Sequence, residues 1–199
     1  MRLEGETKKK SEIRKTALAL FQKNGYDAVT INEICAASGI SKNTFYYYFA
    51  GKEALIMDLF HVILSMSEDE LIKIMAISDP LEQLRYVWHI LTADAEALGR
   101  EVMKKTLMAN LARAESLEMD CKDRKHEPNP YYEMLKSMYE RAQALGEVRD
   151  DVPPARLIKS SVVIFIGCLQ VWSTAPVKLS LSEMYSNNFD LMILSPKKK

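Results

Sequence analysis

The sequence has little of what marks a secreted, metal-binding or catalytic protein. Its three cysteines, Cys35, Cys121 and Cys168, lie far apart with no CxxC pair, which argues against a disulfide framework and favours a reducing compartment. The three histidines are isolated, no HExxH pattern occurs, and no glycine-rich phosphate loop is present. We therefore predict no metal site, no cofactor and no enzymatic activity.

Glycine, proline and long hydrophobic runs are also scarce. The seven glycines and seven prolines fall between periodic segments, which favours long helices. The N-terminal residues MRLEGETKKK include no apolar run, so no signal peptide is expected, and the most apolar stretch, residues 162–172, is too short to span a bilayer. These features predict a soluble cytoplasmic protein that does not bind membranes.

The formal net charge is zero, yet the charges are unevenly distributed. Residues 1–52 contain nine Lys/Arg against five Asp/Glu, a net charge of about +4, which leaves about −4 on the rest of the chain. A basic head on an acidic body is the asymmetry expected when one end of a protein approaches a polyanion. The charge distribution therefore makes nucleic acid a candidate partner of the N-terminal end.

Apolar residues recur at intervals of three and four through most of the chain, which predicts an all-α fold. A capping box at Thr30-Ile-Asn-Glu33 opens a short helix that should turn Ile34 and Ala37 inward, and Ser41 caps the helix after it. About nine helices are expected, over residues 13–24, 31–37, 41–48, 51–77, 80–95, 100–119, 130–145, 155–173 and 181–194.

The two short helices and the Ser-Gly-Ile turn between them form a helix-turn-helix pattern, in which the second helix enters the DNA major groove. At roughly 100° per residue, Phe45 and Phe49 lie on the inward face of that second helix. The remaining positions all carry hydrogen-bond donors: Lys42, Asn43, Thr44, Tyr46, Tyr47 and Tyr48. An asparagine amide pairs with adenine and a lysine with guanine acceptors, whereas hydroxyl groups suit phosphate oxygens.

Lys52 lies in the first turn of the next helix, where the macrodipole disfavours a cation. Free N–H groups together with a lysine at a helix start form an anion site, so a DNA phosphate would explain this placement. The alternative is that Lys52 is a solvated surface residue.

Residues 13–55 resemble the DNA-binding head of the TetR family of bacterial transcriptional regulators. The spacing from Gly39 through Phe49 to Glu53 carries most of this resemblance. The matching positions are Ile13, Ala17, Phe21, Gly25, Thr30, Ile34, Ala37, Gly39, Ser41, Thr44, Phe45, Tyr46, Phe49, Lys52, Glu53 and Leu55. Cys35 stands where the family usually has alanine, and Tyr48 where histidine is commoner.

The resemblance implies a helix-turn-helix domain over residues 8–52 and a ligand-binding and dimerisation domain over residues 53–195. It implies a repressor that binds a palindromic operator in double-stranded DNA as a homodimer, joined through helices 155–173 and 181–194. The base-reading residues would be Lys42, Asn43 and Tyr46. The residues on the DNA backbone would be Thr30, Thr44, Tyr47, Tyr48 and Lys52. For Thr30 the capping box is a sufficient alternative explanation, and the division of roles between Tyr46 and Tyr47 stays open.

Members of this family respond to a small ligand held among the body helices. The candidate lining residues are Trp88, His89, Thr92, Met103, Met108, Asn110, Tyr131, Met134, Phe165 and Trp172, each of which has core packing as its alternative role. His89 and Asn110 are the best polar candidates, because a pocket needs only a few oriented polar groups. With methionine plentiful beyond residue 56, an apolar or amphipathic ligand is expected.

Two alternatives remain open from the residues alone. The helix at 155–173 is apolar on nearly every side, so it is either the central core helix or packs inward on one face and against a second subunit on the other. The second alternative is that the body docks another protein instead of a small ligand, which would make the chain a DNA-bound adaptor with many chromosomal sites.

Overall fold

The structure is a computed structural model that describes residues 8–63, 66–113, 130–176 and 178–194. Within these ranges the chain forms ten α-helices and no strand, apart from one isolated bridge between Val148 and Leu194. This confirms the predicted all-α class with a helix count close to nine. The chain divides into two compact units, one of residues 1–69 with 94–115 and the other of residues 70–93 with 116–199. The predicted functional division at residue 52 stays a prediction, because these units are defined by packing.

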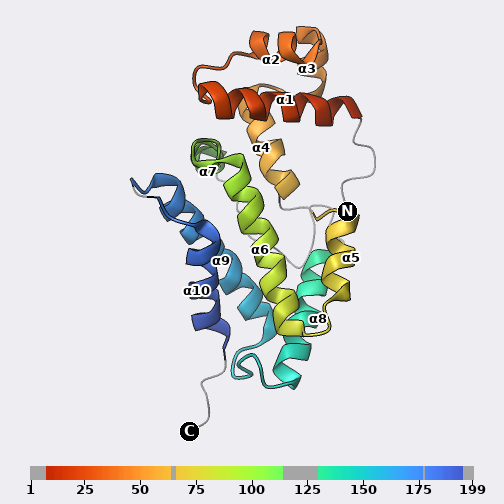
Figure 1. Cartoon of the computed structure of the whole chain (residues 1–199), viewed down its shortest axis with the longest axis vertical. Helices are drawn as coiled ribbons and strands as arrows, with labels where there is room; N and C mark the ends of the chain where they lie inside the picture. The colour runs from red at the N-terminus through yellow and green to blue at the C-terminus, as the bar shows by residue number, and fades with distance from the viewer. Residues whose placement is uncertain (1–7, 64–65, 114–129, 177, 195–199) are drawn as a thin grey trace. The chain divides into compact units, whose positions relative to one another are not determined.

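The first unit is built around a three-helix head (Figure 1). It contains α1 (Lys8–Asn24), α2 (Ile31–Ser38), α3 (Lys42–Tyr48), α4 (Lys52–Ile63), the end of α6 (Pro80–Leu98) and α7 (Arg100–Arg113). Helix α2 packs on both α1 and α3, and α4 packs on α7. The predicted inward residues Ile13, Phe21, Ile34, Phe45 and Phe49 are all buried, so the hydrophobic effect holds the head together through these side chains.

An ion cluster ties α1 to α4 inside this unit. Arg14, on the polar side of α1 by sequence pattern, is only 6% exposed. Its guanidinium donates to Asp58 on α4 at 2.9 Å, and the Lys10 ammonium donates to the other carboxylate oxygen at 2.5 Å. Asp58 thus supplies the partner that a buried guanidinium requires.

The second unit contains most of α5 (Glu68–Ala76), the start of α6, α8 (Pro130–Ala144), α9 (Pro154–Thr174) and α10 (Leu181–Ile193). Helix α9 packs on α8 and on α10, which runs beside it in Figure 1. Inside this unit the Tyr139 hydroxyl lies 2.6 Å from the Ser161 hydroxyl, and the Tyr185 hydroxyl donates to the Ser161 carbonyl at 3.3 Å. Burial raises the pKa of both phenols well above the usual value, so both stay neutral donors.

Two expectations about the helices are corrected. The single long helix over 51–77 is wrong, since α4 is helical to Ile63, Met66 and Ser67 are not helical, and α5 begins at Glu68. The sequence Ser67-Glu-Asp-Glu70 has the form of a capping box, a signal for a new helix start that the apolar periodicity conceals. In α2 the inward neighbour of Ile34 is Cys35 and not Ala37, which is exposed. The end of the helix expected at 100–119 and the loop expected at 121–129 lie outside the described residues.

Helix α9 is longer than its apolar centre suggested. Its 21 residues are, by length and composition alone, sufficient to cross a membrane, which the expectation from residues 162–172 had excluded. Half of its most apolar window is buried inside the protein, however, and core helices of soluble proteins have the same length and composition. The other part of α9 leaves apolar side chains exposed, among them Val163 and Val171.

Candidate functional site

Local sequence signals position the two helices of the helix-turn-helix. At the start of α2 the Glu33 amide donates to the Thr30 hydroxyl at 3.2 Å, and the Thr30 amide donates to the Glu33 carboxylate at 2.7 Å. These hydrogen bonds from Thr30 lower the pKa of Glu33, which keeps the carboxylate ionised at the helix start. Gly39 ends α2 with a φ of 62°, a left-handed conformation that favours glycine, and Ser41 then caps α3.

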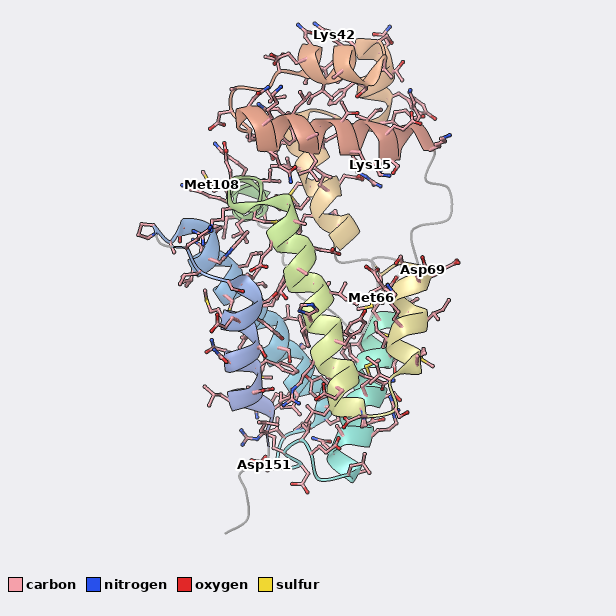
Figure 2. All side chains as sticks on the ribbon, in the orientation of Figure 1. Lys15, Lys42, Met66, Asp69, Met108 and Asp151 are labelled. Carbon is pink, nitrogen blue, oxygen red and sulfur yellow. The ribbon has the colours of Figure 1, made fainter. Side chains whose placement is uncertain are left out.

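The outward face of α3 consists of side chains that donate hydrogen bonds. Phe45 and Phe49 are buried on the inward face, with ring centroids 5.7 Å apart. Opposite them, Tyr46 is 53% and Tyr47 82% exposed, unusual values for aromatic side chains that could have packed in a core. Lys42 and Asn43 are also exposed, and Figure 2 shows Lys42 on the side of α3 that faces away from α1. The structure therefore brings the three predicted base readers, Lys42, Asn43 and Tyr46, onto one exposed surface.

The residues predicted to contact the DNA backbone differ in exposure and in their hydrogen-bond partners. Tyr47 is free to reach outward, and its ring meets the half-buried Tyr48 edge-on at 4.9 Å. The Thr30 hydroxyl serves in the capping box, and the Thr44 hydroxyl lies 2.9 Å from that of Ser41. Their contacts with a DNA backbone stay predictions.

Lys52 has partners inside the first unit. Its ammonium donates to the carbonyls of Tyr26 and Val29, each at 2.7 Å, and lies 4.3 Å from the centroid of the Tyr26 ring. Partial burial lowers the pKa of this ammonium. The loop between α1 and α2 thus supplies the negative partial charges that the sequence interpretation assigned to a phosphate. A phosphate contact by Lys52 stays a prediction.

The same loop is held from its other side by α7 and the end of α6. Lys105 donates to both carboxylate oxygens of Asp27 at 2.7 Å, which lowers the pKa of Asp27. The Tyr26 amide donates to the Glu101 carboxylate at 3.0 Å, and the Gln22 amide donates to the Ala97 carbonyl at 2.6 Å. The position of the head within this unit therefore depends on polar contacts with the turn that joins α6 to α7.

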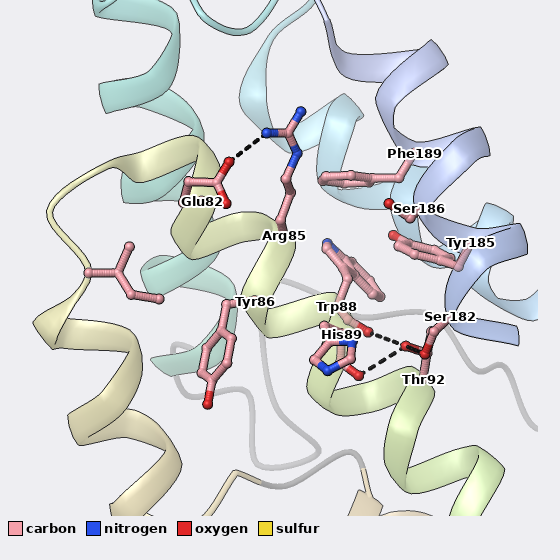
Figure 3. Close-up of a pocket in the computed structure, with 11 residues that line it drawn as sticks. Glu82, Arg85, Tyr86, Trp88, His89, Thr92, Ser182, Tyr185, Ser186 and Phe189 are labelled. Carbon is pink, nitrogen blue, oxygen red and sulfur yellow. Dashed lines mark hydrogen bonds and ion pairs between the residues drawn. The ribbon is translucent and has the colours of Figure 1, made fainter.

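A pocket of about 490 Å³ lies in the second unit between α6 and α10 (Figure 3). Its lining residues are Ile77, Glu82, Arg85, Tyr86, Trp88, His89, Thr92, Ser182, Tyr185, Ser186 and Phe189. The Trp88 and Tyr185 rings lie 5.0 Å apart, and the Tyr185 and Phe189 rings stack at 5.6 Å, so the floor is aromatic. This volume is within the range of small-molecule sites.

The rim of this pocket is polar. The Thr92 hydroxyl lies 2.8 Å from the Ser182 hydroxyl, which joins α6 to α10. Arg85 donates to both carboxylate oxygens of Asp190 at 3.2 Å and to Glu82 at 2.6 Å. Burial disfavours the charged guanidinium, but these hydrogen bonds outweigh it and raise the pKa of Arg85. An aromatic floor with a polar rim suits an amphipathic ligand.

The predicted lining residues are divided between the two units. Trp88, His89 and Thr92 line the α6–α10 pocket together, and Phe165 lies behind it with its ring 5.9 Å from Trp88. In the first unit, Met103 and Asn110 are buried on α7 and Met108 is exposed. In the second unit, Trp172 donates to the Leu179 carbonyl, Tyr131 is half-buried on α8, and Met134 lines a separate groove. The roles of all ten residues in ligand binding stay predictions.

The sequence interpretation missed most of the polar rim. Glu82 and Arg85 precede the predicted His89 at intervals of three and four along α6, opposite the buried Leu84 and Leu91. This amphipathic pattern was available from the sequence. The α10 residues of the pocket carry no comparable signal, because nothing local indicates which helix packs beside α6.

Comparisons with known proteins find similarity to bacterial transcriptional regulators. Residues 13–59 match the family model described as bacterial regulatory proteins, tetR family. The regulator UidR of Escherichia coli strain K12 is 27% identical over 164 residues, which cover 80% of this chain and 79% of UidR. The uncharacterised regulator YerO of Bacillus subtilis is 43% identical over 63 residues, 32% of this chain but only 22% of YerO. The chain therefore aligns with less than a quarter of that relative's length.

A solved structure shares the fold over nearly the whole chain. The Thermus thermophilus repressor FadR, solved in complex with lauroyl-CoA, superposes with a TM-score of 0.59 at 19% identity and covers 92% of each chain. At this identity the similarity establishes the fold and leaves the ligand of the present chain open.

Proposed function

We propose, on the premise that this chain belongs to the TetR family of bacterial transcriptional regulators, that it is a homodimeric repressor released from its operator by a small amphipathic ligand. Its relatives are transcriptional regulators with a helix-turn-helix, not enzymes. The observation that carries the proposal is the outward face of α3, where Lys42, Asn43, Tyr46 and Tyr47 are exposed above a buried phenylalanine pair.

The proposed DNA contacts follow from the chemistry of that face. Asn43 and Lys42 carry groups that pair with adenine and guanine edges in the major groove, with Tyr46 beside them. Tyr47, Tyr48, Thr44 and Thr30 offer hydroxyl groups to phosphates, and Lys52 a cation. A dimer would place two such faces on half-sites about 34–36 Å apart or a multiple of that distance.

The proposed dimer interface uses α9 and α10. On α9, Val163, Gly167 and Val171 recur every four residues on the exposed side, and Leu191 on α10 is 84% exposed. An exposed apolar stripe of this length is uncommon on a monomer and supports an interface. Gly167 lies within the stripe, and no atom lies within 4 Å of the position a Cβ would take, which permits close approach of a second helix.

The proposed effector site is the α6–α10 pocket. Its aromatic floor would bind the apolar part of a ligand, and His89, Thr92 and Ser182 would orient the polar part. The acyl-CoA bound by the T. thermophilus FadR is amphipathic, which supports the ligand class for a related fold.

Selection of bound DNA from a random pool tests the function as a whole. The expected result is one palindromic sequence that occurs at one or a few chromosomal positions near the gene for this chain. Many sites scattered over the chromosome would instead favour the DNA-bound adaptor, and selection without any enriched sequence would overturn the regulator proposal.

Equilibrium dialysis and operator release then test the ligand class. Amphipathic compounds should dissociate the protein from its operator, and His89→Ala should weaken that response without changing DNA affinity in the absence of ligand. If only highly charged metabolites released the DNA, the effector proposal would be wrong.

A further inference from the structure

A second concave site of the same unit lies between α5 and α8, on the Gln83 side of α6. This groove has a volume of about 350 Å³. Its lining residues are Met75, Ile77, Ser78, Gln83, Met134, Ser137, Met138 and Arg141. We call it the methionine groove. All of these residues lie within the second unit, and none except Ile77 lines the α6–α10 pocket.

The walls of the methionine groove are apolar and adaptable. Met75 is 72% exposed at the end of α5, whereas Met138 is buried on α8 and Met134 is half-buried between them. Methionine side chains are flexible and polarisable, so they adjust to unbranched apolar chains of different shapes. A bound apolar chain would remove the exposed surface of Met75 from water, which is favourable.

Arg141 is the only ionisable residue among the described residues that line this groove. Its guanidinium donates one hydrogen bond to the Oε1 atom of Gln83. Gln83 is almost fully buried, and its amide nitrogen donates to the Ile74 carbonyl at 3.0 Å, so its orientation is set by the protein. Gln83 thereby fixes one edge of the guanidinium.

The remaining donors of Arg141 have no acidic partner among the described residues. Of the acids next to the lining residues in the sequence, Glu82 pairs with Arg85, and Glu140 lies 3.9 Å from Lys136. A guanidinium carries five N–H donors in a planar fork that matches a carboxylate. The groove therefore presents an oriented cation beside an apolar wall, with no acid from the described part of the chain to neutralise it.

We propose that the methionine groove is a second ligand site, for amphipathic carboxylates with an unbranched apolar chain. Arg141 binds the carboxylate, the hydroxyl groups of Ser78 and Ser137 flank it, and the methionines cover the chain. This binding does not depend on the proposed operator or on the effector pocket, and it is measured on the protein without DNA.

Decanoate is a suitable probe, used below its micelle-forming concentration with the full-length protein. Calorimetric titration should show saturable binding, and Arg141→Gln should weaken it about tenfold or more, as expected for loss of a charge-assisted hydrogen bond. Lys136→Gln removes the same charge from the same helix and should leave the affinity unchanged. Decyltrimethylammonium, with the same chain and opposite charge, should not bind the groove.

Methyl-¹³C-methionine spectra locate the probe independently. Decanoate should shift the signals of Met75, Met134 and Met138 and leave that of Met57, in the core of the first unit, unchanged. Equal circular dichroism melting of wild type and Arg141→Gln verifies that the variant folds. Unchanged affinity in Arg141→Gln, or shifts absent from these three methionines, would overturn the proposal. Affinity lost in His89→Ala but retained in Arg141→Gln would assign decanoate to the α6–α10 pocket instead and overturn it equally.

Discussion

Lys52 has two candidate roles: it stabilises the fold through its contacts with loop carbonyls, and it contacts a DNA phosphate. Replacement of Lys52 by methionine distinguishes these two roles. The ammonium donates to two loop carbonyls at 2.7 Å and lies 4.3 Å above the Tyr26 ring. Lys52→Met keeps an unbranched stem of similar length and removes only the charge and the donors. The Tyr26 and Val29 carbonyls would then lose a partner that joins the loop between α1 and α2 to the start of α4.

The expected cost follows from these contacts. A hydrogen bond to a charged group contributes about 1.5–3 kcal/mol to stability, with the lower end expected where water can reach the freed acceptors. Lys52 is only half-buried, so we expect a loss of about 2 kcal/mol for the pair of carbonyls together. In a chain of this size that corresponds to a melting temperature lower by about 4–8 °C.

Chemical denaturation measures the loss, and Lys42→Met is the matched control because Lys42 is exposed on α3. The free energy of unfolding of the control should stay within about 0.5 kcal/mol of the wild-type value. A Lys52→Met protein as stable as the control would refute the structural role. Operator binding at several salt concentrations tests the phosphate contact, since each lost contact makes the negative slope of log K against log salt shallower by about 0.9.

Four further substitutions test other parts of the structure. Asn43→Ala should relax preference at one or two operator positions at a cost of about 1–3 kcal/mol, whereas Tyr48→Phe should weaken binding to all sequences alike; a panel of single-base operator variants that showed the reverse would contradict both roles. Val163→Asp should produce a monomer in sedimentation equilibrium, and an intact dimer would exclude the α9 interface. Asn110→Leu should raise the free energy of unfolding by about 1–2 kcal/mol, because both amide atoms are buried without a partner in the described part of the chain; a less stable variant would point to a bound partner.

The pH dependence of stability gives one more test. The pKa of Asp27 is lowered in the folded state, so its stabilising contribution is present above the ordinary value of 3.8 and is lost as the pH falls through the lower folded value. Asp27→Asn should reduce this loss of stability at acid pH, measured as the melting temperature from pH 5 downwards. The same pH dependence in the variant and the wild type would mean that the contact with Lys105 does not persist in solution.

The helix-turn-helix could be predicted almost completely because its determinants are local. The capping box at Thr30 and Glu33, the glycine at 39 and the rotation of about 100° per residue all act within one or two turns. These signals place Phe45 inward and Tyr47 outward without knowledge of any other helix. The break between α4 and α5 was missed because the apolar period continues across it.

The pocket could be predicted only in part, because its composition depends on which helices pack together. Trp88, His89 and Thr92 share one face of α6, so the sequence groups them correctly. Asn110 belongs to α7 in the other unit, and its inclusion rested on polarity alone. Ser182 meets Thr92 across 90 positions of sequence, and no local rule connects two such residues.

The partners of charged side chains likewise could not be predicted from the sequence alone. A lysine at the start of α4 needs a negative partner, since the helix dipole opposes a cation there. The partner found in the structure is a pair of carbonyl oxygens from residues 26 and 29, and Arg14 is matched likewise by an aspartate 44 positions away. Sequence therefore indicates where a charge requires compensation, whereas the fold decides whether protein or ligand supplies it. Arg141 is the converse case: its guanidinium is oriented on Gln83, and no described residue supplies it with an acid, so we propose a ligand as its partner.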